Sequence, residues 1–138
     1  VFAFEVLHRC ELATLLKTET EIEYDVAQTK ITDILVEIDG LKIGVSVVRA
    51  VTFPRSNPYT PEEGDRVLRR KLEAIAESTL NVSDEDRWEK QVLHAIAYGP
   101  QHAEVLEDAW LAIEDAVRGD TVLMITTSDG DDEFLYSN

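Results

Sequence analysis

The dipeptide Asp39-Gly40 separates two runs rich in strand-forming residues, and it constrains the fold of this chain more than any other feature. Asp-Gly favours a two-residue hairpin turn, because both positions adopt positive φ. We therefore predict a hairpin of residues 31–38 and 41–49, whose register the turn fixes. The predicted apolar face pairs Ile38 with Leu41, Val36 with Ile43, Ile34 with Val45 and Thr32 with Val47. The other face pairs Glu37 with Lys42, Leu35 with Gly44, Asp33 with Ser46 and Ile31 with Val48.

Periodic patterns predict helices and strands on both sides of this hairpin. A broad apolar face predicts a helix over residues 2–18, and alternation predicts a strand over 21–26. Thr60 and Pro61 are typical of a helix start, with Glu63 placed to complete a capping box. Three further elements are a helix from Ser83 to Gly99-Pro100, a helix over 102–117 and a buried strand over 121–127. The apolar stripe of the helix that begins near Pro61 is Leu68, Leu72, Ile75 and Ala76.

The predicted order, with a short final strand over 133–136, is αβββααα-β(β). A strand that follows several helices after a meander favours a mixed sheet with helices packed on it. We therefore expect an α/β (α+β) fold with a central mixed sheet. The length of 138 residues fits a single globular domain, residues 1–138. Because the chain begins at Val1 and its only methionine is Met124, we expect it to be part of a longer protein.

Composition narrows the class of protein. The formal charge is −15, from 28 acidic and 13 basic residues, which argues against a long nucleic-acid groove. No apolar run is long enough to span a membrane. The single cysteine, Cys10, cannot form an internal disulfide, so we expect an intracellular, cytoplasmic protein without a disulfide-linked partner. The charge is uneven, since residues 101–138 hold ten acidic residues and one arginine.

The run from Thr32 to Arg49 resembles the core hairpin of the PD-(D/E)XK nuclease superfamily, the restriction-endonuclease-like fold. In that family an acidic residue opens one strand, and the next strand carries an acid, any residue and then a lysine. The resemblance implies a site in which two carboxylates bind Mg²⁺, which prefers oxygen ligands. The metal activates water, and the lysine adds positive charge at the reacting phosphate.

This chain departs from that pattern at two positions. Asp33 matches the first acid, but Ser46 stands at the second acid and Val48 at the lysine. Relocated side chains are the alternative: Glu23 as a second metal ligand beside Asp33, Glu37 four residues further along the same strand, and Lys42 in place of the lysine. The candidate catalytic residues are thus Asp33, Glu37, Lys42 and Ser46, with Mg²⁺ as the cofactor of an active enzyme. Glu63 and Glu73 on the next predicted helix are further candidate ligands.

A basic stripe is a separate candidate for binding. Arg87, Lys90 and His94 have the spacing of one helix face, which suits a phosphate or an acidic patch of a partner. A solvated face paired with neighbouring acids is the alternative interpretation.

Three functions remain open from the sequence. The first, which we favour, is a non-catalytic nuclease-like fold that works as a binding or scaffold module, with a protein or nucleic acid as partner. The second is a Mg²⁺-dependent nuclease with relocated residues. The third is an acidic inhibitor, of the immunity-protein type, that binds a basic partner through Glu104, Asp108 and Glu114.

Overall fold

A computed structural model describes residues 2–11, 13–52 and 57–128. The strand expected over residues 133–136 lies outside the described residues. The elements are α1 (Phe2–Glu11), β1 (Thr14–Thr18), β2 (Ile34–Ile38), β3 (Leu41–Ala50), α2 (Pro61–Asn81), β4 (Lys90–Ala97), α3 (Pro100–Ala112), α4 (Asp115–Arg118) and β5 (Val122–Thr127).

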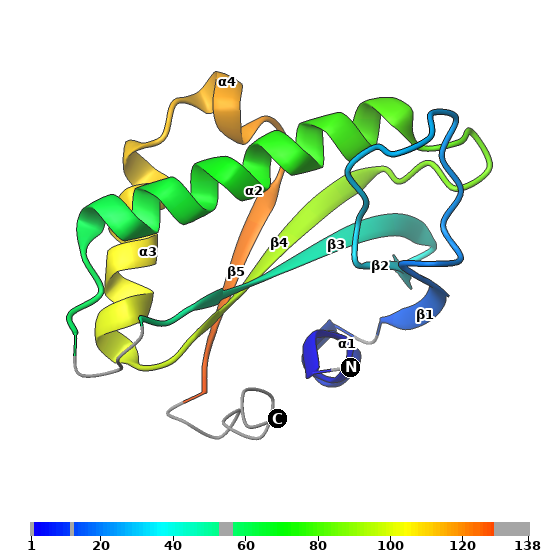
Figure 1. The fold of residues 1–138 in the computed structure, drawn as a ribbon. Helices are drawn as coiled ribbons and strands as arrows, with labels where there is room; N and C mark the ends of the chain where they lie inside the picture. Colours follow the sequence, from blue (N-terminus) through cyan, green and yellow to red (C-terminus); the bar gives the residue numbers. More distant parts are fainter. Residues whose placement is uncertain (1, 12, 53–56, 129–138) are drawn as a thin grey trace.

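The strands form one mixed sheet in the order β1-β2-β3-β4-β5 (Figure 1). β1, β2 and β3 pair antiparallel, whereas β3, β4 and β5 pair parallel. Each parallel connection passes through helices, α2 between β3 and β4 and then α3 and α4 between β4 and β5, as parallel pairing requires. The expected mixed sheet flanked by helices is therefore confirmed.

The hairpin has the predicted register. Asp39 and Gly40 have φ of 52° and 80°, as the Asp-Gly turn requires. The ladder runs from Ile38–Leu41 to Ile34–Val45. It ends there, so the expected pairs of Asp33, Thr32 and Ile31 are wrong.

Both faces of the sheet are covered by helices (Figure 1). On one face, α2 and α3 pack on β3, β4 and β5, burying among others Leu68, Leu93 and Leu106. On the other face, α1 contributes Leu7 to a second core with Val36 and Val45 of the hairpin. The middle of the hairpin is therefore buried, whereas Glu37, Leu41 and Lys42 at its turn end are exposed.

The N-terminal prediction was wrong in two places. The first helix ends at Glu11, and residues 14–18 form the edge strand β1 instead of continuing the helix. Pairing with β2 outweighs the helix propensity of this stretch, because strand preference depends on the neighbours that a strand finds. The strand expected over residues 21–26 is an irregular segment, in which Tyr24 forms an isolated bridge with Val82.

The helix expected from Ser83 to Gly99-Pro100 was also wrong, since residues 90–97 form β4. A central strand buried on both faces has a continuous apolar run, which periodicity alone does not distinguish from a buried helix. Gly99 and Pro100 begin α3 instead of ending a helix, with proline at its first position.

The other helix and strand predictions were largely right. Thr60 caps α2, and its hydroxyl accepts a hydrogen bond from the Glu63 amide at 3.2 Å. The Glu63 carboxylate accepts hydrogen bonds from Arg66 and not from the Thr60 amide, so the expected capping box is only half formed. The helix predicted over 102–117 is divided into α3 and α4, and Val117 is exposed. Ala76 is exposed as well, unlike the rest of its predicted stripe. The strand β5 is half-buried because it lies at a sheet edge.

Candidate functional site at the start of β2

Asp33 lies immediately before β2 and holds the main chain of β3. Its amide donates to the Val45 carbonyl at 3.1 Å, and its carboxylate accepts from the Val47 amide at 2.7 Å. These bonds go to the residues on either side of Ser46. They do not form the ladder pair of Asp33 with Ser46 that the hairpin register predicted. The carboxylate thus replaces a main-chain acceptor at the point where the ladder ends.

Ser46 belongs to a chain of buried, uncharged polar groups instead of an ionic site. The amide of Gln91 donates from Nε2 to Thr32 Oγ1 at 2.8 Å, and Ser46 Oγ donates to Gln91 Oε1 at 3.5 Å. Thr32 Oγ1 lies 3.2 Å from Ser78 Oγ, which donates to the Ile75 carbonyl. Ser46, Gln91, Thr32 and Ser78 are all at most 5% exposed. Neutral groups that satisfy one another are the arrangement expected where solvent is excluded.

Val48, at the position of the lysine in the resembled motif, is 7% exposed and belongs to the core beneath α2 and α3. An ammonium group at this position would have to be buried without a partner, at a large cost in free energy. The local packing is therefore apolar where the motif would need a charge.

The proposed substitute residues lie at the other end of the hairpin. Glu37 and Lys42 face each other across the ladder, as predicted. Among the described residues they form no ion pair with each other, and the Lys42 ammonium donates instead to the main-chain carbonyl of Glu85 at 2.6 Å. This bond ties the beginning of β3 to the loop before β4.

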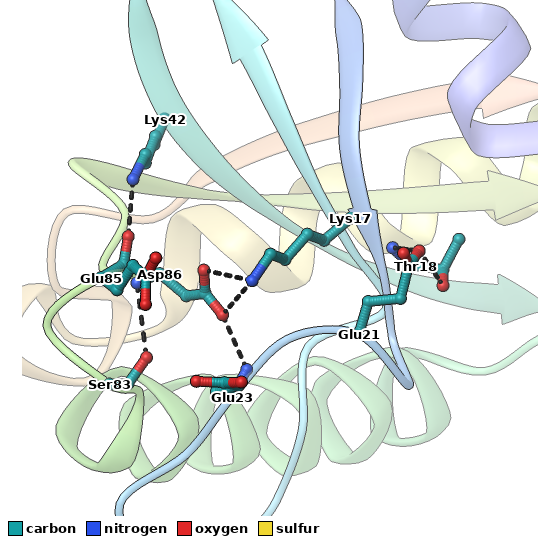
Figure 2. Close-up of polar contacts among 8 residues, drawn as sticks. All are labelled: Lys17, Thr18, Glu21, Glu23, Lys42, Ser83, Glu85 and Asp86. Atoms are coloured by element: carbon teal, nitrogen blue, oxygen red, sulfur yellow. Dashed lines mark hydrogen bonds and ion pairs between the residues drawn. The ribbon is translucent and has the colours of Figure 1, made fainter.

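An ion pair that the sequence analysis missed lies beside Lys42 (Figure 2). Lys17 of β1 contacts both carboxylate oxygens of Asp86, at 2.8 and 3.0 Å. The main-chain amide of Glu23 donates to the same carboxylate at 2.8 Å. Asp86 is 2% exposed, so this pair joins β1, the loop after it and the α2–β4 loop in a largely buried contact. The sequence did not indicate this ion pair, because Lys17 and Asp86 were each assigned to a predicted helix that the structure does not contain at that position.

Three partners together set the charge state of Asp86. Burial raises the pKa of its carboxyl group, but the hydrogen bonds from Lys17 and from the Glu23 amide outweigh this effect, so the pKa is lowered overall. The positive charges of Lys17 and Lys42 act in the same direction. On the other side of the pair, the hydrogen bond to Asp86 raises the pKa of Lys17. The pair is thus held in its charged form.

The basic stripe does not exist as one helix face, because its residues lie in a turn and a strand. Arg87 forms an ion pair with Asp84, and Lys90 is exposed at the beginning of β4. His94 is fully buried, and its Nε2 lies 2.8 Å from the hydroxyl of Thr126 in β5. Burial lowers the pKa of His94 to about 4, which keeps the ring neutral. The three side chains therefore share no surface.

The remaining candidate ligands are dispersed. Glu63 is at the first turn of α2, Glu73 is in the middle of that helix, and Glu23 is in the loop after β1. Across residues 2–11, 13–52 and 57–128, no three His, Cys, Asp or Glu side chains are grouped so that they could hold a metal ion.

Comparisons with known proteins describe what this chain is similar to. No protein-family model matches it. The AAC-rich mRNA clone AAC4 protein of Dictyostelium discoideum is 36% identical over 142 residues, a match that covers 99% of this chain and 20% of that protein. The chain thus spans about a fifth of the length of this relative. A solved structure of Pyrococcus furiosus SfsA in complex with Ca²⁺ matches with a TM-score of 0.41 and 17% identity, over 91% of this chain and 52% of the other. Within the described residues, no helix has the length and apolarity needed to cross a membrane.

Proposed function

We propose that this chain is a restriction-endonuclease-like fold that has no catalytic metal site and works as a binding or scaffold module. Its element order begins α1-β1-β2-β3-α2-β4, which fits the order of the superfamily that the hairpin motif resembles. Asp33 stands where that family has its first acid, at the beginning of the second strand. The fold and the place of the site are therefore compatible with nuclease ancestry.

The observation that carries the proposal is the contact between Ser46 and Gln91. At the position of the second acid, a neutral hydroxyl is 5% exposed and bonded to a neutral amide. A hard cation such as Mg²⁺ needs carboxylate or water oxygens in octahedral geometry, and one carboxylate does not provide them. The Asp33 carboxylate, moreover, is already bonded to the Val47 amide.

The nuclease alternative depends on relocated ligands. Glu37 and Lys42 lie at the turn end of the hairpin, whereas Asp33 lies at the opposite end of β2. A strand rises about 3.3 Å per residue, so four residues separate Glu37 from Asp33 by roughly 13 Å along the strand. Two metal ligands lie within about 5 Å of each other, so this spacing favours the non-catalytic proposal.

A cleavage assay tests the proposal. Supercoiled plasmid, single-stranded DNA and RNA are incubated with the chain and Mg²⁺ or Mn²⁺, in parallel with an Asp33→Asn variant. We expect no cleavage above that of the variant. Metal-dependent cleavage by the natural chain that is absent from Asp33→Asn would overturn the proposal.

A basic partner is the second candidate function, and a groove between α2 and α3 favours it. The groove has a volume of about 440 Å³ and an apolar floor that includes Val105 and Ala109. Glu62, Asp65 and Asp108 line it as well, and Asp65 is paired with Arg69. A lysine or arginine stem packs well on such a floor while its charge meets the carboxylates. Of the predicted contact residues, Asp108 lines the groove, whereas Glu114 is bonded to Arg69.

A lysine-rich peptide is the probe for this second candidate. We expect a double variant, Glu62→Gln with Asp108→Asn, to weaken binding about fivefold at low salt, since two carboxylates are removed at the contact. The matched control removes the same charge at Glu19 and Glu89, which are exposed and lie outside the groove. An equal loss in both double variants would mean that net charge alone attracts the peptide.

A further inference from the structure

A pocket of about 580 Å³ lies between the loop before β2 and the second half of α2. The loop contributes Thr29, Lys30 and Ile31, and Ile31 is half-exposed. The helix contributes Arg70, Lys71, Glu73, Ala74 and Glu77. The volume is within the range of pockets that hold small molecules. Three cationic residues from two separate segments thus line one pocket in a chain whose net charge is −15.

The cations of this pocket differ from most of the other basic residues that the structure describes. Among the described residues, Lys30, Arg70 and Lys71 form no ion pair or hydrogen bond through their side chains. The hydrogen bond from Arg66 lowers the pKa of the nearby Glu63, and the charge of Arg70 acts in the same direction. By contrast, ion pairs with acids engage Arg9, Arg66, Arg69, Arg87 and Arg118. Three cations against the two carboxylates of Glu73 and Glu77 give the pocket lining a net charge of +1 in a chain whose net charge is −15, and a positive lining favours an anion.

Two carboxylates share the pocket and narrow the choice of ligand. Glu77 is turned to the loop, where the hydroxyl of Thr29 donates to it at 3.4 Å. The hydroxyl of Thr29 in turn accepts a hydrogen bond from the side-chain nitrogen Nδ2 of Asn81 at 2.8 Å. Glu73 has no ion-pair or hydrogen-bond partner within the described part of the chain. The pocket therefore offers cations for an anionic group and one free carboxylate for a donor.

We propose that this pocket binds a small molecule that carries a phosphate group and, a few bonds away, an ammonium group. The guanidinium of Arg70 and the ammonium groups of Lys30 and Lys71 suit phosphate oxygens, since charge-assisted hydrogen bonds of this kind are the strong ones. Glu73 accepts from the ammonium group of the ligand. A nucleic-acid strand fits less well, because a phosphate backbone needs cations along an extended track. This proposal does not depend on whether the chain once had a metal site.

An NMR titration at low ionic strength tests the proposal with three probes: O-phosphoethanolamine, inorganic phosphate and ethanolamine. We expect saturable shifts of the amides of residues 29–31 and 70–77 with phosphoethanolamine, weaker binding of phosphate and none of ethanolamine. Arg70→Gln and Lys30→Gln are each expected to weaken the affinity for phosphoethanolamine about fivefold. Lys90→Gln is the matched control, because it removes one positive charge at an exposed position outside the pocket.

A Glu73→Gln variant separates this pocket from general electrostatic attraction. Removal of its charge is expected to raise the affinity for inorganic phosphate about threefold, because a carboxylate that repels the phosphate is lost. The affinity for phosphoethanolamine is expected to fall about threefold, because the ammonium group of this probe loses its acceptor. Glu89→Gln, exposed and outside the pocket, is expected to change neither affinity.

The proposal is overturned if phosphoethanolamine causes no saturable shift in the pocket, or if Glu73→Gln moves both affinities in the same direction. Tighter binding of a single-stranded oligonucleotide than of phosphoethanolamine would also overturn it. So would binding to phosphatidylethanolamine vesicles without binding of the free headgroup, since the ligand would then be a membrane surface. Circular dichroism of each variant verifies that the fold is retained.

Discussion

The side-chain amide of Gln91 in β4 reaches the hydroxyl of Thr32, with 2.8 Å between Nε2 and Oγ1, although β3 lies between β4 and the segment that contains Thr32. The path passes over Gly44, where a Cβ atom would lie 2.5 Å from Gln91 Nε2. The absence of a side chain at one position of β3 thus lets a neutral amide fill the region beside Ser46. This is the region in which the resembled family would place charge.

Replacement of Gln91 tests the network. In Gln91→Leu the volume is nearly kept, but Ser46 loses its partner and the Thr32 hydroxyl keeps only Ser78, in a site that excludes water. We expect a loss of about 1–3 kcal/mol in the free energy of unfolding, the usual cost of leaving buried polar groups unsatisfied. Urea denaturation measures it. Glu89→Gln, an exposed neighbour, serves as the control and is expected to stay within about 0.5 kcal/mol of the natural chain.

A Gly44→Ala substitution tests the path of the Gln91 side chain. The new methyl group would lie 2.5 Å from Gln91 Nε2 and 2.8 Å from Trp88 Cδ2, so either the amide or the indole must move. We expect a loss of about 1–3 kcal/mol, as for other overpacked cores. At Gly99, an alanine methyl group would meet His102 Nδ1 at 3.7 Å, an ordinary contact, so Gly99→Ala is the comparison variant and is expected to lose only what an alanine at the N-cap of α3 costs. Equal thermal stability of the two variants would contradict the account.

The hairpin could be predicted from the sequence because its determinants are local. Asp39-Gly40 specifies the turn, and alternation specifies the register as far as Ile34. The register fails at Asp33, because its carboxylate competes with the main chain for the Val47 amide. Such competition between a side chain and a ladder is not visible in apolar periodicity. The prediction therefore gave the register of the hairpin correctly as far as Ile34 and misplaced the bonds of Asp33.

The errors elsewhere have one physical cause, which is tertiary contact. Most of residues 90–97 are apolar and buried, because β4 is a central strand between two parallel neighbours, and such a run also fits a buried helix. The incorrect helix placed His94 beside Arg87 and concealed its burial. Likewise, the Lys17–Asp86 pair joins residues 69 positions apart, a contact that no local pattern indicates.

The burial of His94 predicts a pH dependence of stability. Burial lowers its pKa from 6.5 to about 4, so the native ring stays neutral where the unfolded chain binds a proton. Stability is therefore expected to fall as the pH decreases from 6.5 to 4, by up to about 3 kcal/mol from this residue. His94→Gln, which keeps a partner for Thr126, is expected to remove that part of the dependence. An NMR titration midpoint of His94 above pH 6 would contradict it.

The lowered pKa of Asp86 predicts a second pH dependence of the free energy of unfolding, at lower pH than that of His94. The folded pKa of Asp86 is below the ordinary value of 3.8, so the charged form stabilises the fold above that pH. The contribution is lost as the pH falls through the folded pKa. We expect Asp86→Asn to lose about 1–3 kcal/mol at pH 7 and the difference from the natural chain to shrink below pH 4. Asp84→Asn is the control, because that carboxylate is 95% exposed. A difference that persists unchanged at pH 2 would contradict this assignment.

The central claim is that a neutral hydrogen-bond network occupies the place of a metal site, and a Mn²⁺ titration followed by NMR tests it most directly. Paramagnetic broadening reports any ion bound near Asp33, and the Asp33→Asn variant identifies broadening that depends on this carboxylate. The account predicts no saturable broadening of the amides of residues 32–34 and 45–47 and no difference between the two chains. Saturable, stoichiometric broadening of these amides that Asp33→Asn abolishes would contradict it.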